Sequence, residues 1–509
     1  MARRAVGSPP GVAGEAPAVE KFGLVVEGRQ SSALSGETFE VRNPANTDEI
    51  VGIVAQGSPE DVERVVAGAR RALRTSWWPH LEESRRRGRV LQRYAAMVEE
   101  RKQDLARLLT REQGKVLRES LSELDSLINT FEYYAGYGGK ITGTVVFARD
   151  GDNILKVETR KYPIGVCAAV LPFNFPVSLY AWKVAPALMA GNAVIVKPAS
   201  TAPLTEVVLT EMLHEAGVPA GIASLIAGPS ATTGDAIIRH PAIKKVALTG
   251  STETGKVVYA AAAAGLKRLT LELGGSDPTV VCDDADLEMA AETIVKSGRF
   301  RNAGQSCTSV KRVYVMARVF EQFSDLVART TRALRLGNGL EPSVDMGPLN
   351  NAQVREDVER LLQDAVRRGA VVAAGGARPS GREYERGYFL QPTVLLDVPQ
   401  TAEIWEEECF GPVLPLMKVG DLDEAIDLAN ASPYGLGSAI WSRDDARIER
   451  FIDRIQAGMV WVNYKPLSLP EAPFGGVKDS GIGRELGAEG LEAYLETKAI
   501  RKYTGKAPA

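Results

Sequence analysis

The sequence predicts an α/β protein in which helices cover mainly parallel β-sheets. The first observation behind this prediction is that short apolar runs alternate with longer amphipathic segments between residues 162 and 273. We expect buried strands over 166–171, 193–196 and 245–248, and helices over 179–189 and 204–216. Strands and helices that alternate at this spacing form βαβ units, in which the strands are parallel and ligands bind beyond their carboxyl ends.

The second observation is that a similar alternation begins again near residue 279. The expected elements are a strand up to Cys282, a helix up to about residue 299, a strand over 310–316, helices over 319–334 and 354–368, and strands over 371–372 and 393–396. A chain of 509 residues exceeds what one hydrophobic core normally organises. We therefore expect a second α/β domain of a size comparable to the first.

Three further segments complete the expected order of elements. Residues 59–134 have a helical pattern, because apolar residues recur every three or four positions and charges occupy the other face. Residues 140–160 alternate weakly and predict a pair of strands outside the main sheet, and residues 491–503 predict a closing strand. Residues 1–20, rich in proline, glycine and alanine, predict a disordered tail.

Charge and hydropathy narrow the class of partner. The chain has 61 basic and 64 acidic residues and a net charge of −3, which gives no electrostatic reason to expect nucleic acid or an anionic membrane surface. No apolar run is long enough to cross a bilayer, and no signal peptide is recognisable. We expect a cytoplasmic protein whose partner is a small molecule.

The cysteines and histidines exclude several kinds of site. Cys167, Cys282, Cys307 and Cys409 are far apart and form no C-x-x-C pair, so neither a disulfide framework nor a zinc site is predicted. None of the three histidines lies in a motif, which argues against a Ser-His-Asp triad. We expect no metal site.

Cys307 is the candidate nucleophile. It ends the stretch Phe-Arg-Asn-Ala-Gly-Gln-Ser-Cys over residues 300–307, between an amphipathic helix and a β-rich run. A turn at this place can direct the sulfur into a cavity. Because a free cysteine is more often a small buried hydrophobe, the assignment depends on the motifs around it.

Five further motifs stand in order along the chain. They are Leu-Pro-Phe-Asn-Phe-Pro at 171–176, Thr-Leu-Glu-Leu-Gly-Gly at 270–275, Glu-Glu-Cys-Phe-Gly-Pro at 407–412, Pro-Phe-Gly-Gly at 473–476 and Ser-Gly-Ile-Gly-Arg-Glu at 480–485. With Cys307 they resemble the aldehyde dehydrogenase superfamily from about residue 22 to residue 503. The stretch before Cys307 is similar in sequence to the matching stretch of succinate-semialdehyde dehydrogenases.

The resemblance implies a fold and an assembly. It implies a Rossmann-type dinucleotide-binding domain over 21–139 and 162–273, and a second α/β catalytic domain over 274–475. Residues 140–161 and 488–505 would form a small oligomerisation β-element, because the matching strands pair across subunits in the family. We accordingly expect a homodimer or homotetramer.

The resemblance also implies the catalytic residues. Cys307 would attack an aldehyde and form a thiohemiacetal, whose oxyanion would be bound by the Asn174 side chain and the Cys307 backbone N–H. Glu272, 35 residues before Cys307, would act as general base for hydrolysis of the thioester. CoA-acylating relatives lack this glutamate, so water is the expected acyl acceptor here. Lys183 matches a family lysine with a supporting role.

A dinucleotide site is expected around residues 250–256. This Gly-Ser-Thr-Glu-Thr-Gly-Lys run resembles a P-loop and suggests a nucleotide hydrolase as an alternative, but Val257 stands where Mg²⁺ needs a hydroxyl. Glycine before a helix start still favours a phosphate. The family resemblance places Gly250 and Ser251 at the pyrophosphate of NAD or NADP.

Other cofactor contacts follow from the resemblance alone. Lys197 would contact the adenosine ribose, and Ser200 replaces a glutamate of many NAD-dependent relatives, which permits NADP. The nicotinamide half would be bound by Glu408 at the ribose and Phe410 at the ring. Phe173 and Leu273 complete the expected cofactor-binding residues.

The substrate remains open between two classes. Arg301 matches the arginine that binds the carboxylate in succinate-semialdehyde dehydrogenases, which favours a semialdehyde. A second such arginine is absent, because Trp182 stands at its position. Phe173, Trp182 and Tyr464 would equally suit a neutral apolar aldehyde. A non-catalytic, crystallin-like role is a further alternative, against which the joint presence of Cys307 and the other catalytic residues argues.

Overall fold

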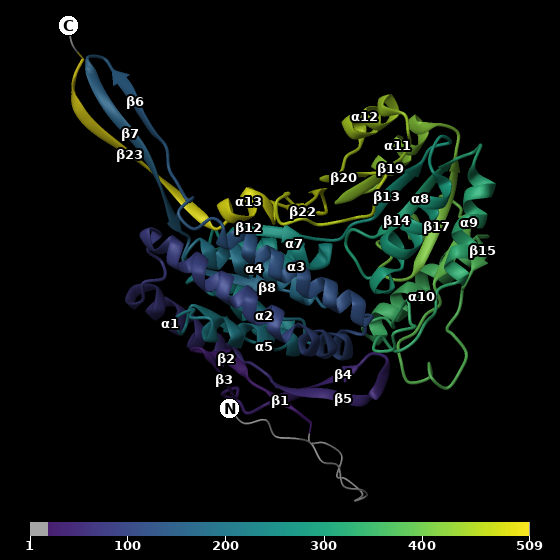
Figure 1. The fold of residues 1–509 in the computed structure, drawn as a ribbon, viewed down its shortest axis with the longest axis horizontal. Coiled ribbons are helices and arrows are strands. Elements are labelled where there is room, and N and C mark those ends of the chain that lie inside the picture. Colours follow the sequence, from purple (N-terminus) through teal and green to yellow (C-terminus); the bar gives the residue numbers. More distant parts are fainter. Residues whose placement is uncertain (1–18, 508–509) are drawn as a thin grey trace, which may run out of the picture.

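The computed structural model describes residues 19–507, so the predicted tail lies almost entirely outside the described residues. Figure 1 shows two α/β units side by side, with a narrow three-stranded sheet that projects away from the first unit. The predicted α/β class is thereby confirmed. None of the helices within residues 19–507 has both the length and the apolar character that a membrane span requires.

The first unit is organised around an eight-stranded sheet in the order β22-β12-β11-β8-β9-β10-β2-β3. Its strands are β2 (Leu24–Val26), β3 (Arg29–Ser31), β8 (Val166–Val170), β9 (Ala193–Lys197), β10 (Ala223–Leu225), β11 (Ile243–Thr249), β12 (Arg268–Glu272) and β22 (Gly481–Ile482). The five central strands are parallel. The chain runs outward from β8 in both directions, which makes the β8–β11 boundary a topological switch point where ligands bind.

Helices surround this sheet in layers. They are α1 (Pro59–Thr75), α2 (Ser84–Gln113), α3 (Leu117–Ala135), α4 (Pro176–Met189), α5 (Leu204–Glu215), α6 (Asp235–Arg239) and α7 (Thr252–Ala263). Helices α4 and α5 contact the sheet, and α2 and α3 pack on them as an outer layer. Helix α1 begins at a capping box, because the Ser58 hydroxyl accepts the Asp61 N–H and the Asp61 carboxylate accepts the Ser58 N–H.

The second unit contains a seven-stranded sheet in the order β15-β16-β17-β14-β13-β19-β20. Its strands are β13 (Asp277–Val281), β14 (Val310–Met316), β15 (Val371–Ala374), β16 (Thr393–Leu396), β17 (Val413–Val419), β19 (Gly437–Trp441) and β20 (Met459–Val462). All neighbours are parallel except β15 and β16. The covering helices are α8 (Leu287–Thr293), α9 (Phe320–Arg332), α10 (Ala352–Arg367), α11 (Leu422–Asn430) and α12 (Asp445–Arg454).

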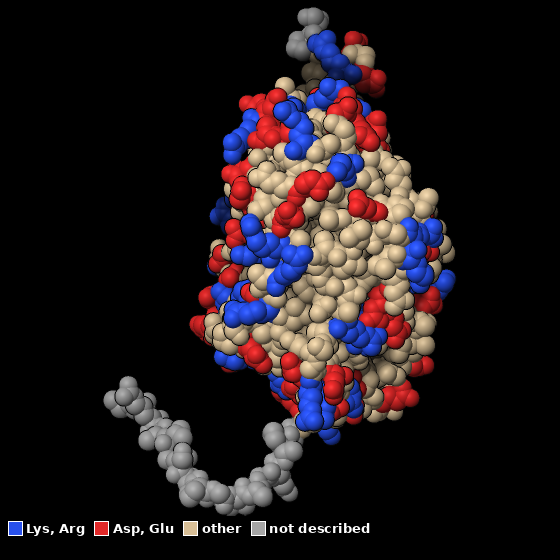
Figure 2. All heavy atoms as spheres, turned by 90° about the vertical axis from the view of Figure 1, so that its right-hand side faces the viewer, with Lys and Arg blue, Asp and Glu red and all other residues tan. Residues whose placement is uncertain are grey.

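The outer face of the second unit carries mixed charge. Figure 2 shows basic and acidic side chains interspersed over this face. The second unit also contains ion pairs between partly or fully exposed side chains, such as Lys418 with Glu321 and Arg378 with Glu359. Since both signs alternate, this face has no continuous basic track of the kind that follows a nucleic-acid backbone.

The projecting sheet consists of β6 (Val145–Asp150), β7 (Asn153–Pro163) and β23 (Leu495–Lys506), all antiparallel. The predicted closing strand over 491–503 is wrong at its start, because the short helix α13 (Gly487–Glu492) precedes β23. Leu491 and Tyr494 are buried in the core of the first unit. Their inward packing prevents this segment from pairing as a strand until residue 495.

Several strands have no counterpart among the predicted elements. Strands β1 (Lys21–Phe22), β4 (Thr38–Asn43) and β5 (Asn46–Ala55) form a separate small sheet, and β18 (Tyr434–Gly435) pairs with β21 (Val477–Lys478). Most of these segments have two to six residues. Strands this short contain too few alternations for a periodic pattern to be recognised.

A buried ion pair ties the outer helices to the sheet. Lys115, between α2 and α3, pairs with Glu123 of α3, and both side chains are fully shielded from solvent. Lys115 also donates to the backbone carbonyl of Asn174 at 2.8 Å. The Glu123 carboxylate accepts hydrogen bonds from the N–H groups of Val177 and Ser178 at 2.7 and 3.0 Å. These N–H groups lie in the first turn of α4 and have no partner within the helix.

We predict that Lys115→Met lowers the free energy of unfolding by about 3–5 kcal/mol, because it leaves the buried Glu123 carboxylate without its cation. Urea unfolding of the purified protein measures this change. The control is Lys418→Met, which removes an exposed pair with Glu321 and should cost less than about 1 kcal/mol. Equal losses in the two variants would contradict the prediction.

Candidate active site

Cys307 lies on a tight turn between the two units. The turn begins with the 3₁₀ segment η4 (Arg301–Gly304), in which Asn302 and Ala303 have φ values of 51° and 52°. Asn302 holds this left-handed backbone: its N–H donates to the Glu119 carboxylate at 3.1 Å, and its side chain donates to the Asn174 carbonyl at 2.8 Å. Cys307 then precedes β14, as the sequence predicts.

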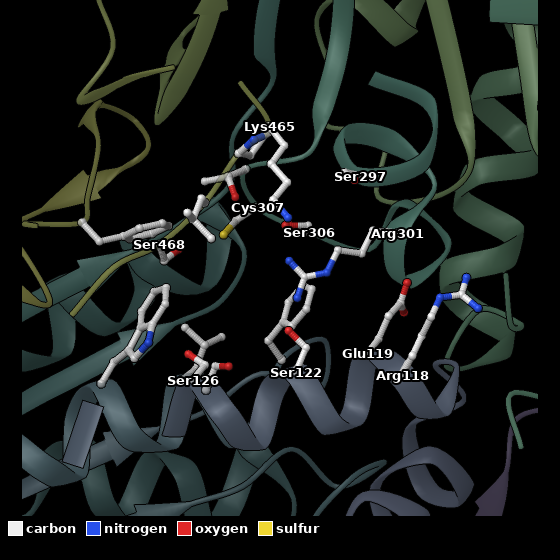
Figure 3. Close-up of a pocket in the computed structure, with 18 of the residues that line it drawn as sticks. Arg118, Glu119, Ser122, Ser126, Ser297, Arg301, Ser306, Cys307, Lys465 and Ser468 are labelled. Atoms are coloured by element: carbon white, nitrogen blue, oxygen red, sulfur yellow. The ribbon is translucent and has the colours of Figure 1, made fainter. Parts of the chain in front are cut away.

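Two cavities meet at the Cys307 side chain. One, of about 340 Å³, opens beside α3 and is drawn in Figure 3. The other, of about 520 Å³, lies at the ends of the first sheet and continues toward α10 of the second unit. Cys307 lines both. A thiol in this position can reach molecules bound on either side.

Glu272 stands at the end of β12 and lines the 520 Å³ cavity with Cys307. It is 2% exposed, and neither carboxylate oxygen has a hydrogen-bond partner among the described residues. Burial raises the pKa of Glu272 to about 8, although the neighbouring Cys307 side chain opposes this shift. Glu272 is therefore largely protonated at pH 7 and ionises as the pH rises through 8.

The Cys307 thiol shares this environment. Burial, followed by the neighbouring charge of Glu272, raises the pKa of Cys307 well above its ordinary value. The buried Lys311 opposes the shift, and its ammonium donates to the Cys307 carbonyl at 2.6 Å. The resting sulfur is thus a neutral thiol, and an attack by it requires a base that takes the proton.

Asn174 lines the same cavity, in the segment between β8 and α4. Its carbonyl is fixed by Lys115 and Asn302. The side-chain amide donates to the Gln305 carbonyl at 3.2 Å, and the side-chain oxygen has no partner among the described residues. The backbone of Asn174 is rigidly placed, while its amide makes only one long hydrogen bond.

Lys183 lies behind the residues of the site and lines neither of the two cavities. It is fully buried on α4, where its ammonium donates to the Thr249 hydroxyl at 2.7 Å and pairs with Glu485 at 2.9 Å. Thr249 ends β11 and precedes Gly250. Lys183 thereby links α4 to the end of β11 and to the 480–485 motif.

The 520 Å³ cavity opens at the switch point of the first sheet. Gly250 and Ser251 line it at the start of α7, where the Ser251 side chain caps the helix by accepting the Thr254 N–H. Backbone N–H groups at a helix start favour an anion such as a phosphate. Val257, which is 65% exposed on α7, stands where a P-loop has a serine or threonine. Since valine has no hydroxyl, this turn lacks the Mg²⁺ ligand of a P-loop.

The second unit closes the cavity from the opposite side. Glu408 accepts the Gly275 N–H at 3.2 Å and pairs with Lys311 at 2.7 Å. Phe410 stands edge-on to Phe173, with ring centroids 6.0 Å apart. Leu273, Glu408, Phe410 and Phe173 all line the cavity. Aromatic faces at one end and helix-start N–H groups at the other suit an elongated ligand with a ring and phosphates.

Lys197 and Ser200 lie apart from the residues that line this cavity, near the end of β9. Lys197 is 3% exposed, has no ion pair among the described residues, and donates only to the adjacent Pro198 carbonyl at 3.1 Å. Burial lowers its pKa to about 8. The Ser200 hydroxyl donates to the Gly228 carbonyl at 3.3 Å.

The 340 Å³ cavity receives two of the three predicted substrate residues. Arg301 lies over the Phe175 ring at 5.0 Å, and Trp182 packs on Phe474 with centroids 4.6 Å apart. Tyr464, the third of these residues, is 51% exposed and is not among the residues that line this cavity. The chain turns at Asn463, where φ is 51°, and directs the next residue, Lys465, into the cavity instead.

Several residues of this cavity were missed from the sequence. They are mainly hydroxyl and basic side chains, namely Arg118, Ser122, Ser126, Ser178, Lys296, Ser297, Lys465 and Ser468. Ser122 and Ser126 are four residues apart on α3, so they share one helical face. Polar residues at helical spacing next to an apolar face would have been the available signal.

Comparison with known proteins places the whole arrangement in a family. Residues 31–500 match the profile of the aldehyde dehydrogenase family. A 3-sulfolactaldehyde dehydrogenase of Pseudomonas putida is 40% identical over 95% of this chain and 97% of its own length. A succinate-semialdehyde dehydrogenase of Escherichia coli (strain K12), named for NADP(+), is 38% identical over 93% of this chain and 96% of its own length.

Solved structures agree with the fold. The crystal structure of betaine aldehyde dehydrogenase from Staphylococcus aureus in complex with NAD+ has a TM-score of 0.91 and 35% identity, and covers 94% of each chain. An aldehyde dehydrogenase from Bacillus cereus, solved as a point mutant, has a TM-score of 0.90 and 35% identity over 95% of this chain and 96% of that one. The chain therefore belongs to the aldehyde dehydrogenase family and is an NAD(P)-dependent enzyme that oxidises aldehydes.

Proposed function

We propose that this enzyme oxidises a short aldehyde with an anionic far end, of the semialdehyde kind, to the carboxylate. The observation that carries the proposal is the Arg301 guanidinium in the cavity beside Cys307, which forms no ion pair among the described residues. A partly shielded guanidinium that lines a substrate cavity favours a carboxylate or a similar oxyanion. Relatives at 38% identity are named for succinate semialdehyde and glutarate semialdehyde.

In the first step Cys307 attacks the aldehyde carbon. Glu272 takes the thiol proton, a bond forms between the sulfur and the carbon, and the carbonyl oxygen becomes an oxyanion. The Asn174 amide and the Cys307 backbone N–H donate to this oxyanion, and the loss of one such donor costs about 10²–10³ in rate. To bind the oxyanion, the Asn174 amide would give up its long hydrogen bond to the Gln305 carbonyl.

The 520 Å³ cavity fits NAD or NADP by its chemistry. Gly250 and Ser251 would hold the pyrophosphate at the start of α7, and Glu408 would bind the nicotinamide ribose. Phe410 and Phe173 would hold the nicotinamide ring near Cys307, and Leu273 would complete the wall. When bound, the oxidised nicotinamide supplies the hydride acceptor.

Glu272 then completes the cycle by hydrolysis. After Glu272 has released the thiol proton to solvent, it is again a carboxylate and takes a proton from a water molecule. The water oxygen adds to the thioester carbon, the carbon–sulfur bond breaks, and the proton on Glu272 passes to the Cys307 thiolate. The acid product then leaves. Lys183 acts in support, because its bonds to Thr249 and Glu485 hold the end of β11 beneath the site.

The adenosine end accommodates either dinucleotide. Lys197, buried without an acidic partner in the described part of the chain, is suited to hydroxyls of the adenosine ribose. Ser200 is neutral and would not repel a 2′-phosphate, so NADP is permitted beside NAD.

A neutral aldehyde is the second candidate substrate. One wall of the 340 Å³ cavity is apolar, formed by Phe175, Leu179, Trp182 and Phe474. This wall alone would suit an aliphatic or aromatic aldehyde. The basic and hydroxyl groups on the other walls favour the anionic class.

We further propose that the protein is a homo-oligomer that assembles through its projecting sheet. The sheet leaves the first unit as a narrow arm (Figure 1), and its edge strand β6 is exposed along its whole length. Val145, Val146 and Phe147 are 56%, 55% and 69% exposed. An exposed apolar edge strand is a surface that another chain would cover.

For the base, we predict that wild-type activity rises with pH through about 8, because only the ionised Glu272 accepts a proton. Glu272→Gln should lower kcat by about 10²–10⁴ and remove this rise. The measurement is the steady-state pH profile of NAD(P)H formation. Cys282→Ala, in the buried core, serves as the control and should keep both rate and profile. A Glu272→Gln variant that retains the rise would exclude Glu272 as the base.

For the substrate, we predict that Arg301→Leu lowers kcat/KM for succinate semialdehyde by about tenfold to a hundredfold, mainly through KM. Activity with butanal should stay within about twofold. Arg318→Leu is the control, because it removes a guanidinium from an exposed pair with Asp283. If wild type prefers butanal, the neutral-aldehyde alternative is correct.

For the assembly, we predict that Phe147→Asp shifts the protein toward the monomer, because a carboxylate would be buried in the interface. Size-exclusion chromatography with light scattering gives the mass. Leu266→Asp, at a residue 91% exposed outside the projecting sheet, should leave the mass unchanged. A monomeric wild type would refute the proposed assembly.

A further inference from the structure

The 340 Å³ cavity beside Cys307 is unusually rich in cations. Four basic side chains line it and only one carboxylate does, that of Glu119. Two of the cations are already paired: Lys296 with Glu292 at 2.8 Å and Arg118 with Asp345 at 3.6 Å. The other two are Arg301 and Lys465.

Arg301 and Lys465 have no fixed anionic partner. Within residues 19–507 neither forms an ion pair or a hydrogen bond, and each has only an aromatic neighbour. Glu119 attracts Arg301 from a distance, but its carboxylate is bound to the Asn302 N–H. Both cations are partly shielded from solvent. A partly desolvated cation without a partner is costly, so a bound anion would stabilise this arrangement.

The two cations come from different parts of the fold. Arg301 belongs to the turn before Cys307, and Lys465 belongs to the loop after β20. In Figure 3 their side chains extend into the cavity from two sides, toward the space beside Ser306 and Cys307. An anion in this space would be contacted from two directions.

Hydroxyl groups surround the same space. Ser122 and Ser126 face it from α3, and Ser468 faces it from the Lys465 loop (Figure 3). In the described part of the chain the hydroxyls of these three serines form no hydrogen bonds, so they remain available to a ligand. A cavity with free hydroxyls on two sides suits a ligand that has several oxygen atoms.

We propose that Lys465 and Arg301 together bind a tetrahedral oxyanion of the sulfonate type at the far end of the substrate. This inference rests on the proposed function, which supplies the aldehyde and its attack by Cys307. The two oxygens of a carboxylate lie in one plane and are both satisfied by the planar fork of Arg301. The three oxygens of a sulfonate do not lie in a plane with the sulfur, so a third oxygen remains for the Lys465 ammonium and the serine hydroxyls.

The test compares three aldehydes: 3-oxopropanesulfonate, succinate semialdehyde and the neutral butanal. We measure kcat and KM for wild type, Lys465→Met, Lys465→Arg, Arg301→Leu and Lys418→Met. Wild type should have the highest kcat/KM with the sulfonate. Lys465→Met should lower that value by about tenfold to a hundredfold through KM, and should affect the carboxylate less. Butanal should change by less than about twofold.

Two variants separate the charge of Lys465 from its structural effects. Lys465→Arg keeps a cation and should restore most of the sulfonate preference. Lys418→Met removes a lysine that lies outside this cavity, in an exposed ion pair with Glu321, and should leave the ratio of sulfonate to butanal unchanged. A fall with all three aldehydes alike, or no fall, in Lys465→Met would overturn the inference.

The semialdehyde proposal and the role of Lys465 are distinguished by the same variants. If Lys465→Met has no effect but Arg301→Leu still erases the preference for anions, the semialdehyde proposal stands and the role of Lys465 is wrong. If neither substitution changes the preference, both the anionic substrate and the sulfonate inference are wrong. The Cys307 chemistry is tested independently by turnover of butanal.

Discussion

The buried pair of Lys115 and Glu123 is the interaction on which the site depends. Lys115 binds the carbonyl of Asn174, and Glu123 binds the first N–H groups of α4. The carbonyl of Asn174 also accepts from Asn302, whose strained backbone shapes the turn before Cys307. The ion pair thus holds the Asn174 carbonyl, and the bond from Asn302 to the same carbonyl connects the turn before Cys307 to it. Replacement of the ion pair by an apolar pair would remove one of the two donors to this carbonyl.

The two cavities explain why the enzyme needs two α/β units. The first unit supplies helix-start N–H groups and Glu272 at the ends of parallel strands, where a switch point leaves room for a dinucleotide. The second unit supplies Cys307 and Glu408. In the proposed mechanism neither set suffices alone, because the thiol would face substrate on one side and cofactor on the other. The proposed reaction therefore takes place at the boundary between the units.

Much of this arrangement could be predicted from the sequence, because buried parallel strands are nearly continuous apolar runs. The strands at 166–170 and 193–197 were found in this way, and the motifs around Cys307 led to the family. Loop geometry could not be predicted. The positive φ at Asn463 decides whether Tyr464 or Lys465 enters the cavity, and no periodic pattern reports one backbone angle. The serines on α3 were missed because a polar face of a helix usually contacts water.

The neutral state of Cys307 affects how readily its sulfur is oxidised or alkylated. Oxidants and alkylating agents react with thiolates far faster than with thiols, and its raised pKa keeps the thiolate scarce at neutral pH. Glu272, mostly protonated until the pH approaches 8, does not remove the proton at rest. With Cys307 as the proposed nucleophile, the enzyme would keep its sulfur in the less reactive thiol form between turnovers, and the burial that raises the pKa would also protect the sulfur from oxidation.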